Sequence, residues 1–189
     1  MCRGRIPALF GFRRLLRDER GVSAIEFALI LPLLLLLVLG TADVTEAVSA
    51  RRKVTLAANA VSDLVAQVRE VDGPYLDNVF AAGSAILVPF DGSRLSVVVS
   101  SIVIAANGEA TVAWSIGRNA APRNKNGRFP VPSDLANQSS LIVAEVSFSF
   151  VPTIGYGVID ELALADTSYS RPRPTSASSI GVGCTASGC

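Results

Sequence analysis

An apolar run from Val22 to about Ala42 constrains this chain more than any other feature, and Glu26 is the only charged residue inside it. A helix needs roughly 20 apolar residues to cross a hydrocarbon core about 30 Å thick. Residues 22–42 are therefore predicted to form a transmembrane segment. A carboxylate in such a segment is costly, so Glu26 is expected to have a partner.

The residues before this run are basic. Residues 1–21 hold six arginines against Asp18 and Glu19. Because cytoplasmic flanks carry the excess of Lys and Arg, residues 1–21 are predicted to be a basic cytoplasmic leader, with the bulk of the chain outside. A basic triplet at residues 51–53 follows the run; it weakens this asymmetry without reversing it, and the sequence has no second apolar span.

The helical pattern continues beyond the membrane segment. Apolar residues recur with a 3.6-residue period, and after Gly40 the next glycine or proline is Gly73-Pro74. This predicts one helix of roughly 45 to 50 residues, with an amphipathic extension over 43–72 that packs either on its own domain or on another subunit. Pro32 is expected to kink or loosen the helix, because proline removes a backbone donor.

The rest of the chain favours strands. Residues 75–170 are predicted to be an exported β-rich domain, in which Asn107-Gly108 marks a hairpin and 117–139 form a polar surface loop. Strands are expected at 85–90, 95–106, 110–116, 141–151 and 163–169, with a short helix or turn at 75–85 and another short helix at 133–137. Leu141-Ile142-Val143 is apolar on both faces and is expected to be covered on both sides. The predicted fold class is α+β, a long helix packed on a small antiparallel sheet.

Residues 171–189 are predicted to be a flexible tail rich in proline, serine and glycine. Cys184 and Cys189 lie in it, five residues apart. An extracytoplasmic compartment permits a disulfide between them, and a tail with two free thiols is the alternative.

Composition argues against several classes of function. The chain has no histidine, so it lacks the commonest general base and zinc ligand, and it shows no phosphate-binding glycine loop. Its net charge of +1 disfavours nucleic acid as a partner. We expect neither an enzyme nor a protein with a cofactor or metal; the scattered acidic residues match no calcium loop.

The junction at Gly21 offers Glu26 two kinds of partner. In the intact chain, Arg20 or interfacial water could serve. If the chain is cut after Gly21, Val22 becomes an N-terminus whose ammonium lies one helical turn from Glu26, within reach of its own carboxylate or that of a neighbouring subunit. The second arrangement would serve polymerisation or docking.

The sequence Arg17-Asp18-Glu19-Arg20-Gly21-Val22-Ser23-Ala24-Ile25-Glu26-Phe27-Ala28-Leu29-Ile30-Leu31-Pro32-Leu33-Leu34 resembles the N-terminal signature of TadE-like proteins, minor pseudopilins of tight-adherence (Flp-type) pilus systems. The resemblance is close over residues 17–65. Residues 145–152 and 167–173 are similar to the family's late strand and closing Pro-Arg element. The resemblance implies cleavage after Gly21 by a prepilin peptidase of the bacterial inner membrane, which would place Glu26 at the fifth mature position. It also implies a pilin-like fold with a periplasmic domain, and a non-catalytic role in pilus assembly with other pilins or pseudopilins and the Flp/Tad assembly components.

Two alternatives remain open. A secretory signal peptide could end at Val48-Ser49-Ala50, although the apolar run is longer than the usual core and the helical pattern crosses that site. The chain could also be an unprocessed signal-anchored membrane protein whose periplasmic domain binds a pilus, an adhesin or a secretion component. In that reading the sheet and loop 117–139 would contact an adhesin or an outer-membrane secretin.

Overall fold

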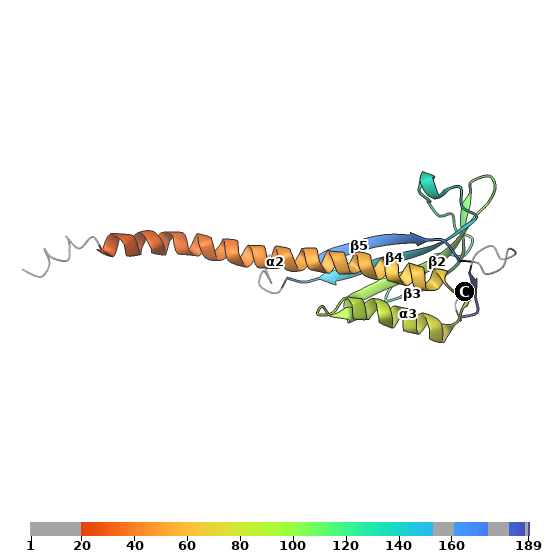
Figure 1. The fold of residues 1–189 in the computed structure, drawn as a ribbon, viewed down its shortest axis with the longest axis horizontal. Helices are drawn as coiled ribbons and strands as arrows, with labels where there is room; N and C mark the ends of the chain where they lie inside the picture. The colour runs from red at the N-terminus through yellow and green to blue at the C-terminus, as the bar shows by residue number, and fades with distance from the viewer. Residues whose placement is uncertain (1–19, 153–160, 174–181, 188) are drawn as a thin grey trace, which may run out of the picture.

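One long helix dominates the structure, a computed structural model that describes residues 20–152, 161–173, 182–187 and 189. Helix α2 (Arg20–Ala66) is 47 residues long, which confirms the predicted length. Its first half projects away from the rest of the chain, and its second half lies along a small α+β domain (Figure 1). The predicted leader, apart from its last two residues, lies outside the described residues.

Helix α2 ends earlier than predicted. It stops at Ala66, and a two-residue strand, β1 (Glu70–Val71), precedes a second helix, α3 (Gly73–Ile86). Asp72 caps α3, because its carboxylate accepts a hydrogen bond from the backbone N–H of Tyr75 at 2.8 Å. Gly73-Pro74 therefore begins a helix, where proline is tolerated, and the predicted extension to residue 72 is wrong. The strand expected at 85–90 is also wrong, since α3 runs into it.

Four antiparallel strands form the sheet, in the order β3-β2-β4-β5. Their bounds are β2 (Leu95–Ile104), β3 (Ala110–Arg118), β4 (Ser140–Phe150) and β5 (Leu162–Ser170). The predicted hairpin joins β2 to β3, and Gly108 adopts a φ of +80° in its turn, a conformation that favours glycine. Two short 3₁₀ helices, Gly92–Arg94 and Ser133–Leu135, complete the elements.

The main core lies between one face of the sheet and the two helices. Strand β4 contributes alternate residues to it, namely Ile142, Ala144, Val146, Phe148 and Phe150, as its sequence predicts. From α2, Val54, Val61 and Val65 are buried, and fully buried alanines between them let the helix approach the sheet closely. The outer half of α2 therefore packs on its own domain, and the α+β architecture is confirmed.

The opposite face of the sheet carries a second, smaller core. Leu141 and Val143 pack there with Phe129 from the loop after β3, while Ile142 faces the helices. The expectation that this part of β4 is covered on both sides is confirmed. The loop is more than a polar surface excursion, because its middle pairs with β3: Phe129 N–H donates to Ala110 C=O at 3.0 Å.

A bulge in β3 lets both cores form. The register between β2 and β3 shifts between Ser101 and Ile102, which leaves Ala113 as an extra residue. Trp114 consequently faces the helices, and Val112 faces the loop. Without the bulge, one of these two side chains would point away from its core.

The C-terminal residues 182–187 pack against the domain, in contrast to the predicted free tail. Strand β6 (Gly183–Cys184) pairs in parallel with β1, and the indole Nε1–H of Trp114 donates to the buried Val182 carbonyl at 2.7 Å. A disulfide joins Cys184 to Cys189, with their Cα atoms 6.1 Å apart. Trp114 supplies a buried partner for the tail that composition alone does not reveal.

Candidate functional site

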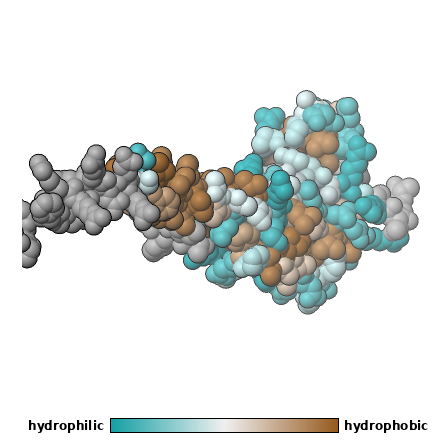
Figure 2. Space-filling view, turned by 60° about the vertical axis from the view of Figure 1, so that its left-hand side comes forward, coloured by the Kyte–Doolittle hydropathy of each residue, from teal (hydrophilic) through white to brown (hydrophobic). Residues whose placement is uncertain are grey.

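The exposed apolar half of α2 is the most unusual surface of the protein. Every residue from 21 to 42 is exposed, including a continuous series of leucines. Figure 2 shows hydrophobic surface, in brown, on the projecting part of the helix. Soluble monomers rarely expose an apolar patch beyond a few hundred Å². Among the described residues, α2 is the one helix long and apolar enough to cross a membrane, and its most apolar window has no residue buried within the chain. The helix is compatible with a single-pass membrane anchor.

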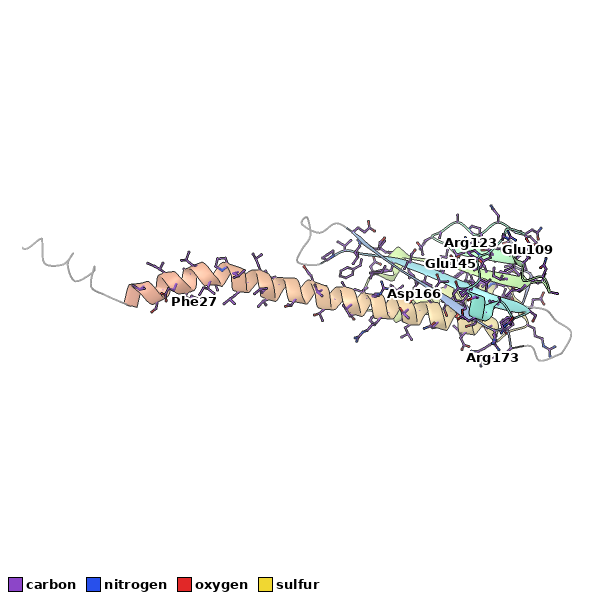
Figure 3. The ribbon with its side chains drawn as sticks, turned by 90° about the horizontal axis from the view of Figure 1, so that it is seen from above. Phe27, Glu109, Arg123, Glu145, Asp166 and Arg173 are labelled. Atoms are coloured by element: carbon purple, nitrogen blue, oxygen red, sulfur yellow. A yellow bond between two sulfur atoms is a disulfide. The ribbon has the colours of Figure 1, made fainter. Side chains whose placement is uncertain are left out.

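Gly21, Val22 and Glu26 lie at the tip of this exposed half. Val22 is 56% exposed, and Glu26 lies one turn further on, near Phe27, whose place Figure 3 marks. Within the part of the chain that the structure describes, Glu26 forms no ion pair. The side chain of Arg20 lies outside the described residues, so the partner of Glu26 stays a prediction.

Gly21 has no role in folding that the structure reveals. A Cβ added at this position would meet no atom within 4 Å, and its backbone is helical. Gly40 is equally unhindered. Packing therefore does not explain the glycine at either position.

Pro32 lies inside an unbroken helix. The helix assignment runs from Arg20 to Ala66 without interruption, and Figure 1 shows one continuous rod. The predicted loosening near Pro32 therefore does not interrupt the helix. Proline within a membrane helix is tolerated, since neighbouring groups can satisfy the carbonyl that it leaves free.

A polar seam fixes the outer half of α2 on the edge strand β5. The buried Ser62 hydroxyl bonds to the hydroxyls of Ser168 and Ser170 at 2.8 and 2.9 Å. The Ser168 hydroxyl also donates to the side-chain oxygen of Asn59 at 2.7 Å. Buried polar groups need partners, so these bonds favour one register of helix on strand. They hold the direction in which the apolar half leaves the domain.

Residues 21–63 match the family model of TadE-like proteins. This part of the chain is TadE-like. The TadE-like segment covers the exposed apolar half of α2 and most of its packed half, and it includes Gly21, Val22 and Glu26. No curated protein and no solved structure matches the chain.

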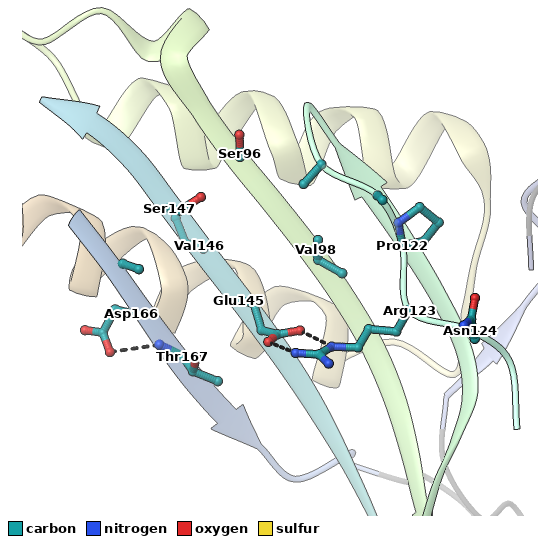
Figure 4. A pocket seen from close by; sticks show the side chains of 13 residues that line it. Ser96, Val98, Pro122, Arg123, Asn124, Glu145, Val146, Ser147, Asp166 and Thr167 are labelled. Atoms are coloured by element: carbon teal, nitrogen blue, oxygen red, sulfur yellow. Dashed lines mark hydrogen bonds and ion pairs between the residues drawn. The ribbon is translucent and has the colours of Figure 1, made fainter. Parts of the chain in front are cut away.

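A second feature lies on the sheet face opposite the helices. A groove of about 460 Å³ is bounded by residues 120–124 and strands β2, β4 and β5 (Figure 4). Arg123 crosses it to Glu145 and makes two hydrogen bonds, one of them from Nε at 2.8 Å. Its guanidinium also lies over the Phe129 ring, 5.2 Å from the centroid.

The Arg123–Glu145 pair fastens the loop to the sheet. Its hydrogen bonds to Glu145 raise the pKa of Arg123 above its ordinary value. An arginine guanidinium is in any case charged at physiological pH. The bidentate geometry favours one loop position over others. Sequence analysis missed this pair because its members are 22 residues apart on different elements.

Acidic residues that lie near one another in the sequence, Asp72 with Asp77 and Asp160-Glu161 with Asp166, do not form a metal site in the part of the chain that the structure describes. Asp72 caps α3, and Asp77 pairs with Arg118. Asp166 accepts hydrogen bonds from the Thr55 hydroxyl of α2 and from a backbone N–H of β5. Across the described residues, no group of three or more metal-ligating side chains comes together. Asp160 is not described.

Proposed function

We propose that the protein is a minor pseudopilin that takes part in assembling a tight-adherence (Flp-type) pilus. It would cross the bacterial inner membrane once, with its N-terminus in the cytoplasm and the α+β domain in the periplasm. One observation carries the proposal: the TadE-like segment begins with an exposed apolar stretch of helix, residues 21–42, in which Glu26 is the one charged residue. Such a helix needs a lipid or protein environment around it.

Processing would give Glu26 its partner. A prepilin peptidase would cut after Gly21 and leave Val22 as an ammonium group. Four residues of helix separate Val22 from Glu26, which corresponds to a rise of about 6 Å. A carboxylate alone in lipid is unfavourable, so a pair with the ammonium of its own or a neighbouring helix lowers that cost. Pairing between helices would set their register in the assembly.

The proposed mechanism is assembly without chemistry. The sequence contains no histidine, so an enzymatic alternative would have to use carboxylate, Tyr, Lys or Cys side chains. The most conspicuous charged pair outside the membrane helix, Arg123 with Glu145, fastens a loop to the sheet. We propose no cofactor, no metal and no nucleic-acid partner.

Two glycine substitutions in the producing bacterium test the proposal against an unprocessed anchor. A leucine at position 21 should block cleavage and abolish surface pili, because a peptidase subsite for glycine excludes it. Gly40→Leu is the matched control: both positions are helical, and an added Cβ meets nothing within 4 Å at either. Normal pili, together with a full-length protein in both the wild-type and the Gly21→Leu strains, would support the alternative. In that alternative the intact protein binds a pilus, an adhesin or a secretion component.

Glu26→Gln separates processing from assembly. The amide keeps the shape of the side chain and removes its charge, so cleavage should continue while pilus number falls. Immunoblotting for the cleaved form and counting pili by electron microscopy measure the two effects separately. Wild-type pilus numbers in this strain would refute the charge pair and leave the cleavage proposal standing.

A further inference from the structure

The base of the α+β domain, on the side from which the apolar half of α2 leaves, is a candidate surface for the membrane itself. The turn after α3 lies there, beside the start of the amphipathic half of α2. A cavity of about 410 Å³ is lined by Thr45, Glu46 and Ser49 on one side and by the 89–90 and 150–151 segments on the other. Because the base lies beside Thr45, Glu46 and Ser49, the position of these residues on α2 gives its distance from the end of the predicted span.

That height is small. The predicted span ends near Ala42, and residues 45 to 49 follow it by about 5 to 10 Å at a rise of 1.5 Å per residue. The headgroup layer adds roughly 5 to 8 Å beyond the hydrocarbon on each side. If α2 crosses the membrane as proposed, the base of the domain lies at the headgroup layer or directly above it.

Two large apolar side chains are exposed at the base, beside the exposed Glu161. Val88 is 66% exposed at the tip of the turn, and Leu162, which pairs in register with Phe150 at the start of β5, is 44% exposed. Phe90 packs edge-on against Phe150 with ring centroids 5.9 Å apart, which supports the turn from within. Exposed apolar side chains on a supported turn match the mode in which peripheral proteins enter the boundary between headgroups and acyl chains.

The same stretch of α2 carries further exposed side chains on another side of the helix. Val44 and Val48 are exposed one turn apart, and Arg51 and Arg52 follow Val48 by three and four residues on that face. Side chains of a helix lean toward its N-terminus, which here is the membrane side. Both arginines are exposed and can therefore reach down to lipid phosphates while their stems cover apolar surface.

We infer that the base of the domain docks on the lipid headgroups of the membrane that α2 crosses. The Val88 turn and Leu162 enter the apolar boundary, and Arg51 and Arg52 contact phosphates. The occupant is the bilayer because exposed valines, Val44 and Val48, follow the span directly and the base lies beside this part of α2. The docking restricts the tilt of α2 and its packed domain relative to the membrane. The inference rests on the proposed membrane anchorage.

Tryptophan scanning with brominated lipid tests the docking. The full chain is placed in vesicles of phosphatidylcholine and phosphatidylglycerol whose acyl chains carry bromine near the headgroups. Val88→Trp adds a fluorophore at the base, and Leu56→Trp is the matched control, since Leu56 is 57% exposed on α2 but lies further from the membrane. Trp114, the one natural tryptophan, is buried and sets a common background.

The added emission should be quenched about twofold more in the Val88→Trp protein than in the control, because a side chain about 5 to 10 Å into the boundary meets the bromines. Leu162→Trp should behave like Val88→Trp and serves if the turn does not accept tryptophan. Equal quenching at the base and in the control would overturn the inference. Quenching at the base that falls as the protein-to-lipid ratio rises would also overturn it, because a neighbouring subunit would then cover the base.

Leu36→Trp separates this inference from the anchorage beneath it. Leu36 is exposed and lies six residues, about 9 Å, inside the predicted end of the span at Ala42, so its substitution reports insertion alone. Strong quenching there with none at the base would reject the docking and leave the anchorage intact. No quenching there would reject both.

Discussion

The contact between α2 and α3 offers a sharp test of the packing. Gly83 of α3 faces Val61 of α2: a Cβ added at Gly83 would lie 3.1 Å from Val61 Cγ2 and 3.8 Å from Leu95 Cδ2. The first distance is too short for unchanged packing, and the second is an ordinary contact. We therefore expect Gly83→Ala and Val61→Ala to be strongly coupled, because the valine methyl groups occupy the space that the alanine methyl needs.

The magnitudes follow from burial. Val61 is fully buried, so Val61→Ala removes two buried carbons, which lowers the free energy of unfolding by about 1.6 kcal/mol, and the cavity left behind lowers it further. The higher helix propensity of alanine offsets about 0.6 kcal/mol of this, so we expect a net loss of about 2 kcal/mol. Gly83→Ala gains about 1 kcal/mol of propensity but overpacks the contact by roughly 1–3 kcal/mol, a net loss of about 1 kcal/mol. With Val61 already alanine, the same change should stabilise by about 1 kcal/mol, so the coupling is about 2 kcal/mol.

Urea unfolding of the full chain in detergent micelles measures these free energies. The single tryptophan, Trp114, is buried in the main core and reports on unfolding of the domain. Val48→Ala is the control for Val61→Ala, since Val48 is half exposed on the same helix, and its effect should be within about 0.5 kcal/mol of zero. Additive effects at Gly83 and Val61, within about 0.5 kcal/mol, would refute the contact.

Three further predictions use the same unfolding assay. Burial raises the pKa of Tyr75, whose hydroxyl donates to the Leu64 carbonyl at 2.8 Å, so the stabilisation from this shift is complete below the unfolded pKa of about 10 and is lost as the pH rises through the folded pKa. The variant Tyr75→Phe should therefore lose less stability at alkaline pH than the wild type, and an unchanged pH profile would contradict this. Asp72→Ala should cost about 1 kcal/mol through the lost cap of α3, whereas no change would mean that the cap is not formed. Reducing the Cys184–Cys189 disulfide should lower the free energy of unfolding by up to about 2 kcal/mol, because the unfolded chain gains loop entropy, and should speed amide exchange in β6. Equal exchange rates in the oxidised and reduced proteins would show that the tail docks without the disulfide.

Local sequence patterns predicted much of this fold. The apolar run and the 3.6-residue stripe predicted the length of α2, because both depend on spacing within a single element. The alternation of β4 and the Asn107-Gly108 turn likewise predicted a half-buried strand and a hairpin. Each of these signals is contained in a few consecutive residues, so no tertiary contact was needed to interpret it.

The misassigned elements depend on contacts between distant residues. Gly73-Pro74 was interpreted as a helix end, although the cap from Asp72 makes it a helix start. The packed tail depends on Trp114, 68 residues away from the carbonyl that it binds. In the same way, Phe129 lies in a segment rich in helix breakers and polar residues, and only its pairing with β3 buries it.

The residues of the candidate site are a prediction from the sequence, and the structure supplies their environment. Gly21, Val22 and Glu26 are recognisable from the boundary between a basic and an apolar segment, and they lie within the TadE-like match. The structure adds that packing at this end of α2 does not require a glycine. It also shows that hydrogen bonds from Ser62 to β5 hold the register of the outer half of α2 on the sheet. That seam joins residues more than one hundred positions apart, so no local pattern reveals it.

The mass of the mature protein tests the central claim most directly. The protein is extracted from membranes of the producing bacterium, and its N-terminal peptide is identified by mass spectrometry. We predict that the mature chain begins at Val22, with a free amino group one helical turn from Glu26. A chain that retains Met1 and the basic leader would contradict the account, and one that begins at Arg51 would establish a secretory signal peptide instead.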